Sequence, residues 1–143
     1  MTYDEVKNLL QGLPGKKKRL AHLREFIDEE LAEIVSISSA QYEGPRVASS
    51  GAQNGTEERY IKHMDRIREY EKTYDELFAE LNKDEKNLMR LMEALTPIEY
   101  DVILNRYFRG KSRRDVAVLM HYEEEWIKSL QRSAIEKMCG AAS

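Results

Sequence analysis

A seven-residue repeat in the middle of the chain constrains the fold most. Large apolar or aromatic side chains recur there at a strict spacing of seven, with further ones four residues after three of them: Tyr60, Met64, Ile67, Tyr74, Phe78, Leu81, Leu88, Met92 and Leu95. An apolar seam of this kind cannot face water and needs a partner helix along its length. The repeat therefore predicts a long helix, from Glu57 to about Glu93, that packs against another helix.

The partner helix is predicted to begin near Lys16 and to end near residue 40. Its apolar residues follow steps of three and four and form one stripe: Leu20, Leu23, Ile27, Leu31 and Ile34. Before it, Thr2 is expected to cap a short helix that ends near Gln11, because the sequence Gly12-Leu-Pro-Gly15 is typical of a break. Between the two long helices, residues 38–55 are rich in Ser, Gly, Ala, Pro and Asn and are expected to form a mobile loop.

The two long helices differ in expected length. The helix from Glu57 to Glu93 would span about 55 Å and its partner about 35–40 Å, at the usual rise per residue. Part of the seam must then be covered by the C-terminal part of the chain or by a second copy, which leaves a homodimer open. Glu71 and Glu85 interrupt the seam, which argues against a long regular coiled coil.

The composition favours an all-α protein. Of the 143 residues 34% are charged, and only seven Gly and three Pro interrupt the helical patterns. Cys139 is the single cysteine, which excludes a disulfide within the chain and favours a reducing compartment. The sequence has no apolar run near 18 residues and no signal-peptide core, so we expect a cytoplasmic protein without a membrane partner.

Charge is distributed unevenly along the chain. Residues 1–95 carry 15 Lys and Arg against 19 Asp and Glu, whereas residues 96–143 carry eight against seven. Five positive side chains stand between Arg106 and Arg114, and a second cluster runs from Lys16 to Arg19. Such clusters can neutralise the phosphates of a nucleic acid, although a charge run on a helical protein is often only a solvated surface.

Residues 96–143 are predicted to form three short helices joined by tight turns. Thr96, Pro97 and Glu99 make a capping box at the start of the first helix, and Gly110 ends it. Its buried face is expected to hold Tyr100, Ile103, Leu104, Tyr107 and Phe108.

The second and third of these helices make a helix-turn-helix pattern. Ser112 is expected to cap the second helix, and Glu123 stands near the start of the third. The inner face of the second helix is predicted as Val116, Ala117, Leu119 and Met120, and that of the third as Ile127, Leu130 or Gln131, Ala134, Ile135 and Met138. Helix-turn-helix proteins place the last helix of such a pair in the major groove of DNA.

The C-terminal segment resembles region 4 of sigma-70-type factors. The resemblance rests on Gly110-Lys-Ser-Arg-Arg-Asp-Val-Ala-Val-Leu-Met120, on Ile127-Lys-Ser and on Ala134-Ile. The whole chain is similar to the ArpU/RinA-type regulators of phages and prophages, which join a helical N-terminal part to such a C-terminus through a loop like Tyr42-Glu-Gly-Pro-Arg46.

The resemblance implies an all-α fold and a function. It implies an N-terminal helical hairpin or coiled coil in residues 1–95 and a sigma-region-4-like helix-turn-helix domain in residues 96–143. It further implies a transcriptional regulator that binds double-stranded DNA, acts on late phage genes in a bacterial host cell, and contacts DNA, RNA polymerase or both. No cofactor is implied.

The resemblance also implies which residues face DNA. On the recognition helix these are Glu124, Glu125, Trp126, Lys128, Ser129 and Arg132, while Arg113 and Arg114 would lie near phosphates. Arginine can read guanine bidentately and serine is adaptable, whereas Lys128 is expected to hold a phosphate, which fixes the register without reading sequence.

Three positions depart from the pattern. Glu123, Glu124 and Glu125 suit a helix N-terminus but repel phosphates, although a single Glu can accept from cytosine. His121 stands where related modules carry Gly, and it tolerates a positive φ at some cost. Trp126 is bulky for a base contact, and packing against the hairpin or a partner protein is the favoured alternative.

No enzyme signature is present in the sequence. His22, His63 and His121 are scattered, and neither His22 nor His63 follows a Glu at the spacing of a di-iron bundle. Three hypotheses therefore stand: a DNA-binding regulator, an RNA polymerase- or regulator-binding protein with little DNA affinity, and a structural coiled-coil adaptor.

Overall fold

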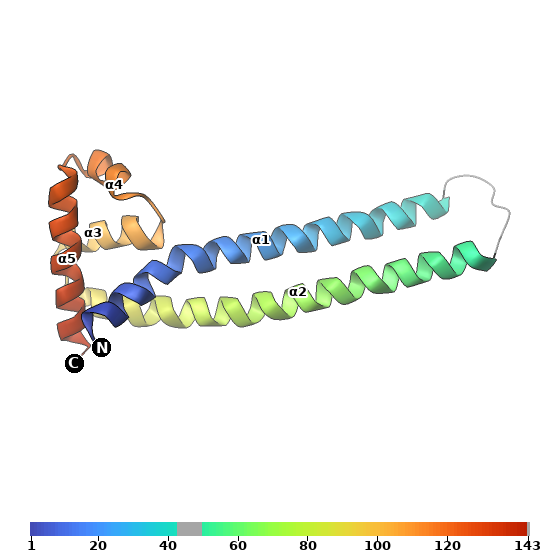
Figure 1. Cartoon of the computed structure of the whole chain (residues 1–143), viewed down its shortest axis with the longest axis horizontal. Coiled ribbons are helices and arrows are strands. Elements are labelled where there is room, and N and C mark those ends of the chain that lie inside the picture. The colour runs from blue at the N-terminus through green and yellow to red at the C-terminus, as the bar shows by residue number, and fades with distance from the viewer. Residues whose placement is uncertain (43–49, 143) are drawn as a thin grey trace. The chain divides into compact units, whose positions relative to one another are not determined.

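The computed structural model describes residues 1–42 and 50–142, and these form helices joined by short turns, with no β-strand among them (Figure 1). The expected all-α class is thus confirmed. In chain order the elements are α1 (Tyr3–Tyr42), α2 (Ser50–Leu91), the 3₁₀ turn η1 (Met92–Ala94), α3 (Pro97–Ile103), the π-helical turn η2 (Leu104–Phe108), α4 (Arg113–Met120) and α5 (Glu124–Ala141).

Contacts group the chain into two compact units. One, here called the terminal unit, holds residues 1–18 and 79–143, and the other, the hairpin unit, holds residues 19–78. Both long helices contribute to both units. The division of the chain into domains at residue 95 stays a prediction. The contacts group the first part of α1, up to residue 18, and the last part of α2, from residue 79, with the C-terminal helices.

The predicted break at residues 12–15 is wrong, because α1 runs through Pro14 without interruption. Proline cannot donate to the carbonyl four residues earlier, and it normally ends a helix. Here Leu10 and Leu13, which precede it in the helix, are fully buried, and this packing outweighs the local preference. The prediction that a separate helix begins at Lys16 fails with it. The cap at Thr2 is confirmed, since its hydroxyl accepts from the Glu5 amide at 3.2 Å.

The prediction of a loop at residues 38–55 is wrong at both ends of that segment. Helix α1 continues to Tyr42 and α2 begins at Ser50, so both flanks of that segment are helical. Residues 43–49, and with them the prediction of mobility, lie outside the described residues.

Helices α1 and α2 contact each other within each unit. In the hairpin unit the ring of Phe26 lies 5.6 Å from that of Tyr70, and Glu30 contacts His63. In the terminal unit Lys16 forms ion pairs with Glu80 and Asp84 of α2, at 2.9 and 2.6 Å. In the hairpin unit the residue numbers fall on α2 as they rise on α1, so the two helices run antiparallel there, as predicted for a hairpin.

The seven-residue seam is only partly covered in the single chain. In the hairpin unit Ile67 is buried, whereas Tyr60 and Phe78 remain exposed. In the terminal unit Leu81 and Leu88 are buried. Each fully buried side chain of this size contributes about 1.5–3 kcal/mol, so the seam stabilises the terminal end of α2 more than its other end.

The positive cluster at Lys16–Arg19 has structural partners. Besides the two ion pairs of Lys16, the Lys17 ammonium pairs with Glu85 at 3.1 Å and donates to the Phe108 carbonyl at 2.5 Å. It also lies over the Phe108 ring, 5.6 Å from its centre. These two lysines therefore tie α1 to α2 and η2 within the terminal unit.

Candidate functional site

The site is built on α3, whose start is fixed by the predicted capping box. The Thr96 hydroxyl accepts from the Glu99 amide at 3.3 Å, and the Glu99 carboxylate accepts from the Thr96 amide at 3.0 Å. The same carboxylate accepts from the Ser133 hydroxyl at 2.8 Å and pairs with Lys137 at 2.7 Å. Although burial opposes ionisation, these bonds from α5 and from Thr96 lower the pKa of Glu99 to about 2. Glu99 thus anchors the C-terminal half of α5 to α3.

A buried asparagine shapes the turn after α3. The Asn105 amide donates to the Asp101 carbonyl at 2.9 Å and accepts from the Arg109 guanidinium at 3.0 Å. Its own carbonyl accepts from the Lys111 amide at 3.0 Å. The chain reverses at Gly110, whose φ of +69° is available to glycine at little cost, as the sequence predicted.

Helices α4 and α5 are joined by a three-residue turn. The Ser112 hydroxyl caps α4 by accepting from the Asp115 amide at 3.1 Å. His121 ends α4 in the left-handed region, with φ at 59°, and the Tyr122 amide donates to the Ala117 carbonyl at 3.0 Å. The expected positive φ at residue 121 is confirmed.

A small apolar core holds α3, α4 and α5 together. It consists of Val102, Val116, Ala117 and Ile127, with Met120 and Leu130 packed against it. The inner face predicted for α4 is wrong at Leu119, which is exposed because it lies about 100° around the helix from Met120 and away from this core.

Helix α5 has one buried and one exposed face. Its buried residues are Ile127, Gln131, Ala134, Ile135 and Met138. Its exposed residues include Glu124, Glu125, Lys128, Ser129 and Arg132, which were predicted to face outward. The outward face is thus confirmed, while a role of these residues on DNA stays a prediction.

A hollow of about 790 Å³ lies along this exposed face. Five of the seven residues predicted to bind DNA line it: Arg113, Glu125, Lys128, Ser129 and Arg132. Arg114 and Glu124 are exposed but do not line it. The first turns of α1 also line it, through Tyr3, Lys7 and Gln11.

Hydrogen bonds organise the base of this hollow. The Arg113 guanidinium donates to the Gln131 side chain at 3.3 Å, and the Gln131 amide donates to the Tyr107 hydroxyl at 2.9 Å. Arg106 donates to the Lys111 carbonyl at 3.0 Å and lies over the Tyr107 ring, while its Nε is buried without a partner among the described residues. Unpaired buried donors of this kind are uncommon in folded proteins.

The balance of charge in the hollow is positive. Five cationic side chains line it, against two carboxylates: Lys7, Arg106, Arg113, Lys128 and Arg132 against Glu125 and Glu136. Arg132 and Glu136 stand 3.7 Å apart and are largely exposed, so their attraction is weak. The hollow can therefore attract an anion.

The α1 residues at the hollow were missed by the sequence analysis. Burial raises the pKa of Tyr3, and the neighbouring Tyr107 raises it further, while Arg132 opposes them. No local pattern in residues 3–11 indicates that they line the hollow, because most of its other lining residues lie more than 100 positions later in the sequence.

A second surface of α4 and α5 is apolar and exposed. Val118 is 70% exposed and Trp126 51%, and Leu119 and Tyr122 are also exposed. Trp126 is therefore not enclosed by the terminal unit. Glu123, Glu124 and Glu125 stand between the two aromatic residues in the sequence.

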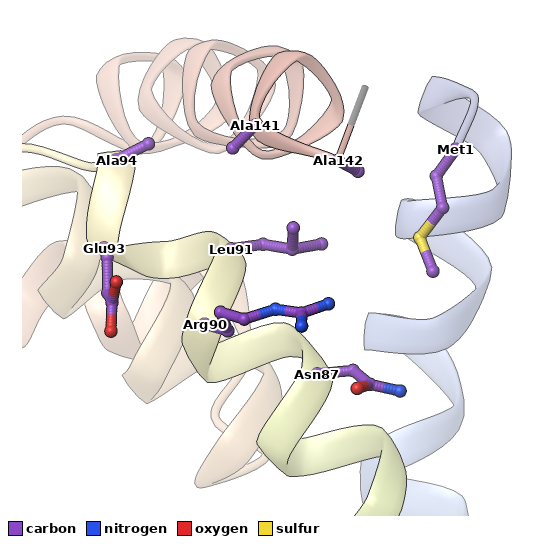
Figure 2. A pocket seen from close by; sticks show the side chains of 8 residues that line it. All are labelled: Met1, Asn87, Arg90, Leu91, Glu93, Ala94, Ala141 and Ala142. Atoms are coloured by element: carbon purple, nitrogen blue, oxygen red, sulfur yellow. The ribbon is translucent and has the colours of Figure 1, made fainter.

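Another pocket, of about 590 Å³, is lined by the ends of α2 and α5 and by Met1, the first residue of the chain. Figure 2 shows Asn87, Arg90 and Leu91 pointing from α2 toward the first turn of α1. The Cys139 thiol donates to the Met1 carbonyl at 2.8 Å close to this pocket's lining at Ala141 and Ala142. Its lining brings together no paired carboxylates or nucleophile and base.

Two further properties concern the described residues as a whole. Residues 1–42 and 50–142 contain no group of three or more His, Cys, Asp or Glu side chains that could hold a metal ion. Within the same ranges, every helix is either too short or too polar to cross a membrane.

Comparisons of the chain with protein-family models, with curated proteins and with solved structures find no match. The functional argument therefore rests on the residues and their geometry.

Proposed function

We propose that the protein is a sequence-specific DNA-binding transcriptional regulator of phage or prophage type, acting on late genes in the bacterial cytoplasm. In this proposal α4, the turn at residues 121–123 and α5 form a helix-turn-helix like that of sigma-70 region 4, with α5 as the recognition helix. The observation that carries it is the shared hollow, where Arg113, Lys128, Ser129 and Arg132 lie together on an accessible face.

Each of these side chains has a chemically suitable role. Arg132 and Ser129 can reach base edges, because guanine offers two acceptors to a guanidinium and a hydroxyl adapts to either base-pair partner. Lys128 suits a phosphate, as do Arg113 and Arg114 at the start of α4. Arg114 is exposed outside the hollow, where it can meet the flanking backbone.

The distribution of charge supports the proposal. The terminal unit carries 15 Lys and Arg against 13 Asp and Glu, while the hairpin unit carries eight against 13. A polyanion is therefore drawn to the unit with the proposed recognition helix and repelled by the other. Glu124 and Glu125 oppose phosphate contact at the first turn of α5, so any contact there is with the exocyclic amino group of cytosine.

The experiment is selection from a random DNA duplex library by the full chain, followed by salt titration on the enriched sequence. We expect an enriched motif whose affinity falls steeply as salt rises. Joint replacement of Lys128, Ser129 and Arg132 by alanine should abolish the enrichment.

A matched control exists on α2 in Arg68, Lys72 and Thr73, all exposed. Arg68 stands 3.7 Å from Asp65, as Arg132 stands 3.7 Å from Glu136. The Thr73 hydroxyl donates to a carbonyl one turn earlier, as does that of Ser129. Alanine at the three control positions should leave binding unchanged, and equal loss in both triple variants would contradict the recognition-helix assignment.

A second candidate is an interaction protein that binds RNA polymerase or another regulator, with little DNA affinity of its own. The exposed apolar surface of Val118, Leu119, Tyr122 and Trp126 favours it, since such surfaces often mark protein contacts. If selection enriches no motif at low salt, this candidate replaces the first. A homodimer through the exposed seam residues Tyr60 and Phe78 is compatible with either function.

A further inference from the structure

We propose that the first three turns of α1 form part of the DNA-binding surface, with Lys7 contacting a backbone phosphate across the hollow from α5. This inference rests on the proposed function and extends it to residues 3–11, about 120 positions away from the recognition helix in the sequence. The consequence is that one strand of the duplex is held between two helices rather than by α5 alone.

The first observation is the register of α1. The residues of α1 that line the hollow, Tyr3, Lys7 and Gln11, are four positions apart and therefore lie on one face of the helix. Asn8 and Lys16 line a different surface pocket, together with Met1 and Glu5. One stripe of α1, with a phenol, an ammonium and an amide, thus faces the hollow.

The second observation is that this stripe is held in place. Val6, Leu10 and Leu13, on the adjacent face of α1, are fully buried. The Thr2 cap fixes the first turn, and the Cys139 thiol on α5 donates to the Met1 carbonyl. Because the backbone is fixed before DNA arrives, a contact from Lys7 costs only the ordering of its own side chain.

The third observation is that Lys7 and Lys128 form no ion pair among the described residues. Among the described residues Lys7 and Lys128 have no carboxylate within ion-pair distance, whereas Lys16 and Lys17 on the same helix are both paired with α2. Lys7 is half-buried and Lys128 is exposed, and both line the hollow. An anion placed between them would be attracted by both and would cost no existing ion pair.

The size of the hollow limits what enters it. A volume of about 790 Å³ is in the range of small-molecule sites, so it admits a stretch of one backbone and not a duplex. The Gln11 amide can donate to a phosphate oxygen beside Lys7. Contacts of this kind fix the register of a protein on DNA and do not depend on base sequence.

The test uses salt titrations of the full chain on the selected duplex, with four lysine variants. Lys7→Gln and Lys128→Gln should each weaken binding, and each should reduce the slope of log K against log salt by about 0.9, the value for one phosphate contact. Lys7→Arg should keep the slope of the unchanged protein. The control, Lys83→Gln, removes an exposed lysine of α2 that does not line the hollow, and it should change nothing.

Two variants that add a positive charge test the same contact without removing a side chain, so a loss of folding cannot explain the result. Gln11→Lys places a second ammonium on the stripe and should increase the slope by about 0.9. Asn8→Lys adds the same charge one residue beyond Lys7 on a different face, and it should leave the slope close to that of the unchanged protein.

The outcomes separate the two proposals. If the unchanged protein and Lys83→Gln bind the duplex but Lys7→Gln keeps their slope, the role of α1 is refuted and the proposed function stands. Tighter binding by Lys7→Gln would likewise refute it, since α1 would then obstruct the DNA. If the unchanged protein enriches no duplex, both the proposed function and this inference fail.

Discussion

Replacing Glu99 with glutamine tests whether the carboxylate, and not merely its shape, holds α5 to α3. Glu99 is 2% exposed and accepts hydrogen bonds from Thr96, Ser133 and Lys137. The amide keeps the volume and one acceptor but loses the charge. The α5 surface proposed for DNA binding depends on this anchor, so the variant also tests how firmly α5 is placed.

The magnitude follows from the pKa of the folded state. The pKa of Glu99 is about 2 in the folded protein against an ordinary value of 4.5. A difference of this size, at about 1.4 kcal/mol per unit, corresponds to about 3 kcal/mol of folding free energy. Because the folded pKa is the lower one, this contribution is fully present above pH 4.5 and is lost as the pH falls toward 2. Glu99→Gln should therefore cost about 3 kcal/mol at pH 7 and almost nothing at pH 2.

The assay is urea unfolding followed by fluorescence of Trp126, the single tryptophan, which lies in the terminal unit. Stability differences between Glu99→Gln and the unchanged protein are measured from pH 7 to pH 2. Glu93→Gln, at an exposed carboxylate with no ion pair among the described residues, should differ little at any pH. A cost for Glu99→Gln that is the same at pH 7 and pH 2 would refute the argument, since it would then come from packing and not from charge.

Three further predictions concern the stability of the fold. Gly15→Ala should stabilise the protein by about 0.5–1 kcal/mol in urea unfolding, because its Cβ would meet nothing within 4 Å inside a helix, whereas Gly110→Ala should destabilise it by about 1–2 kcal/mol at a φ of +69°. In the hairpin unit, the pKa of Glu30 is lowered chiefly by its hydrogen bond with His63. The ionised carboxylate therefore stabilises the folded state above pH 4.5, and this stabilisation is lost as the pH falls below that value. Glu30→Gln should reduce the loss of helical circular dichroism between pH 5 and pH 2, and an unchanged acid transition would contradict the assigned role.

The parts of the fold that the sequence predicted well are those set by short-range rules. Thr96 and Ser112 cap the helices that follow them, and Gly110 adopts a left-handed conformation. Each depends on neighbours within three or four residues, which the sequence displays directly. The seven-residue seam is also local, and it correctly predicted a long helix with a paired neighbour.

The prediction of a helix break at residues 12–15 was wrong because contacts distant in the sequence decide the structure there. Gly12, Pro14 and Gly15 all disfavour a helix locally, and the local rules predict a break. The burial of Leu10 and Leu13 in the terminal unit decides in favour of a continuous helix, and that burial depends on residues far along the chain.

The candidate site likewise has parts that follow from local sequence patterns and parts that depend on tertiary contacts. The outward face of α5 follows from helical periodicity, so its residues could be predicted from the sequence. The bonds of Glu99 with Ser133 and Lys137 join residues 34 and 38 positions apart. The hollow that Lys7 shares with α5 joins residues more than 100 positions apart. No spacing rule connects such positions in a single sequence.

The order of charges along α5 bears on how DNA could approach it. Glu124 and Glu125 occupy the first turn, where they suit the helix N-terminus, whereas Lys128 and Arg132 follow one and two turns later. Phosphates would be repelled at the first turn and attracted further along α5, where Lys128 and Arg132 line the hollow together with Lys7. The acidic start of α5 is thus compatible with DNA binding when the backbone lies toward α1 and the first turn meets base edges. In that arrangement Lys7 and Lys128 contribute to the salt dependence, and Glu125 contributes to the choice of base.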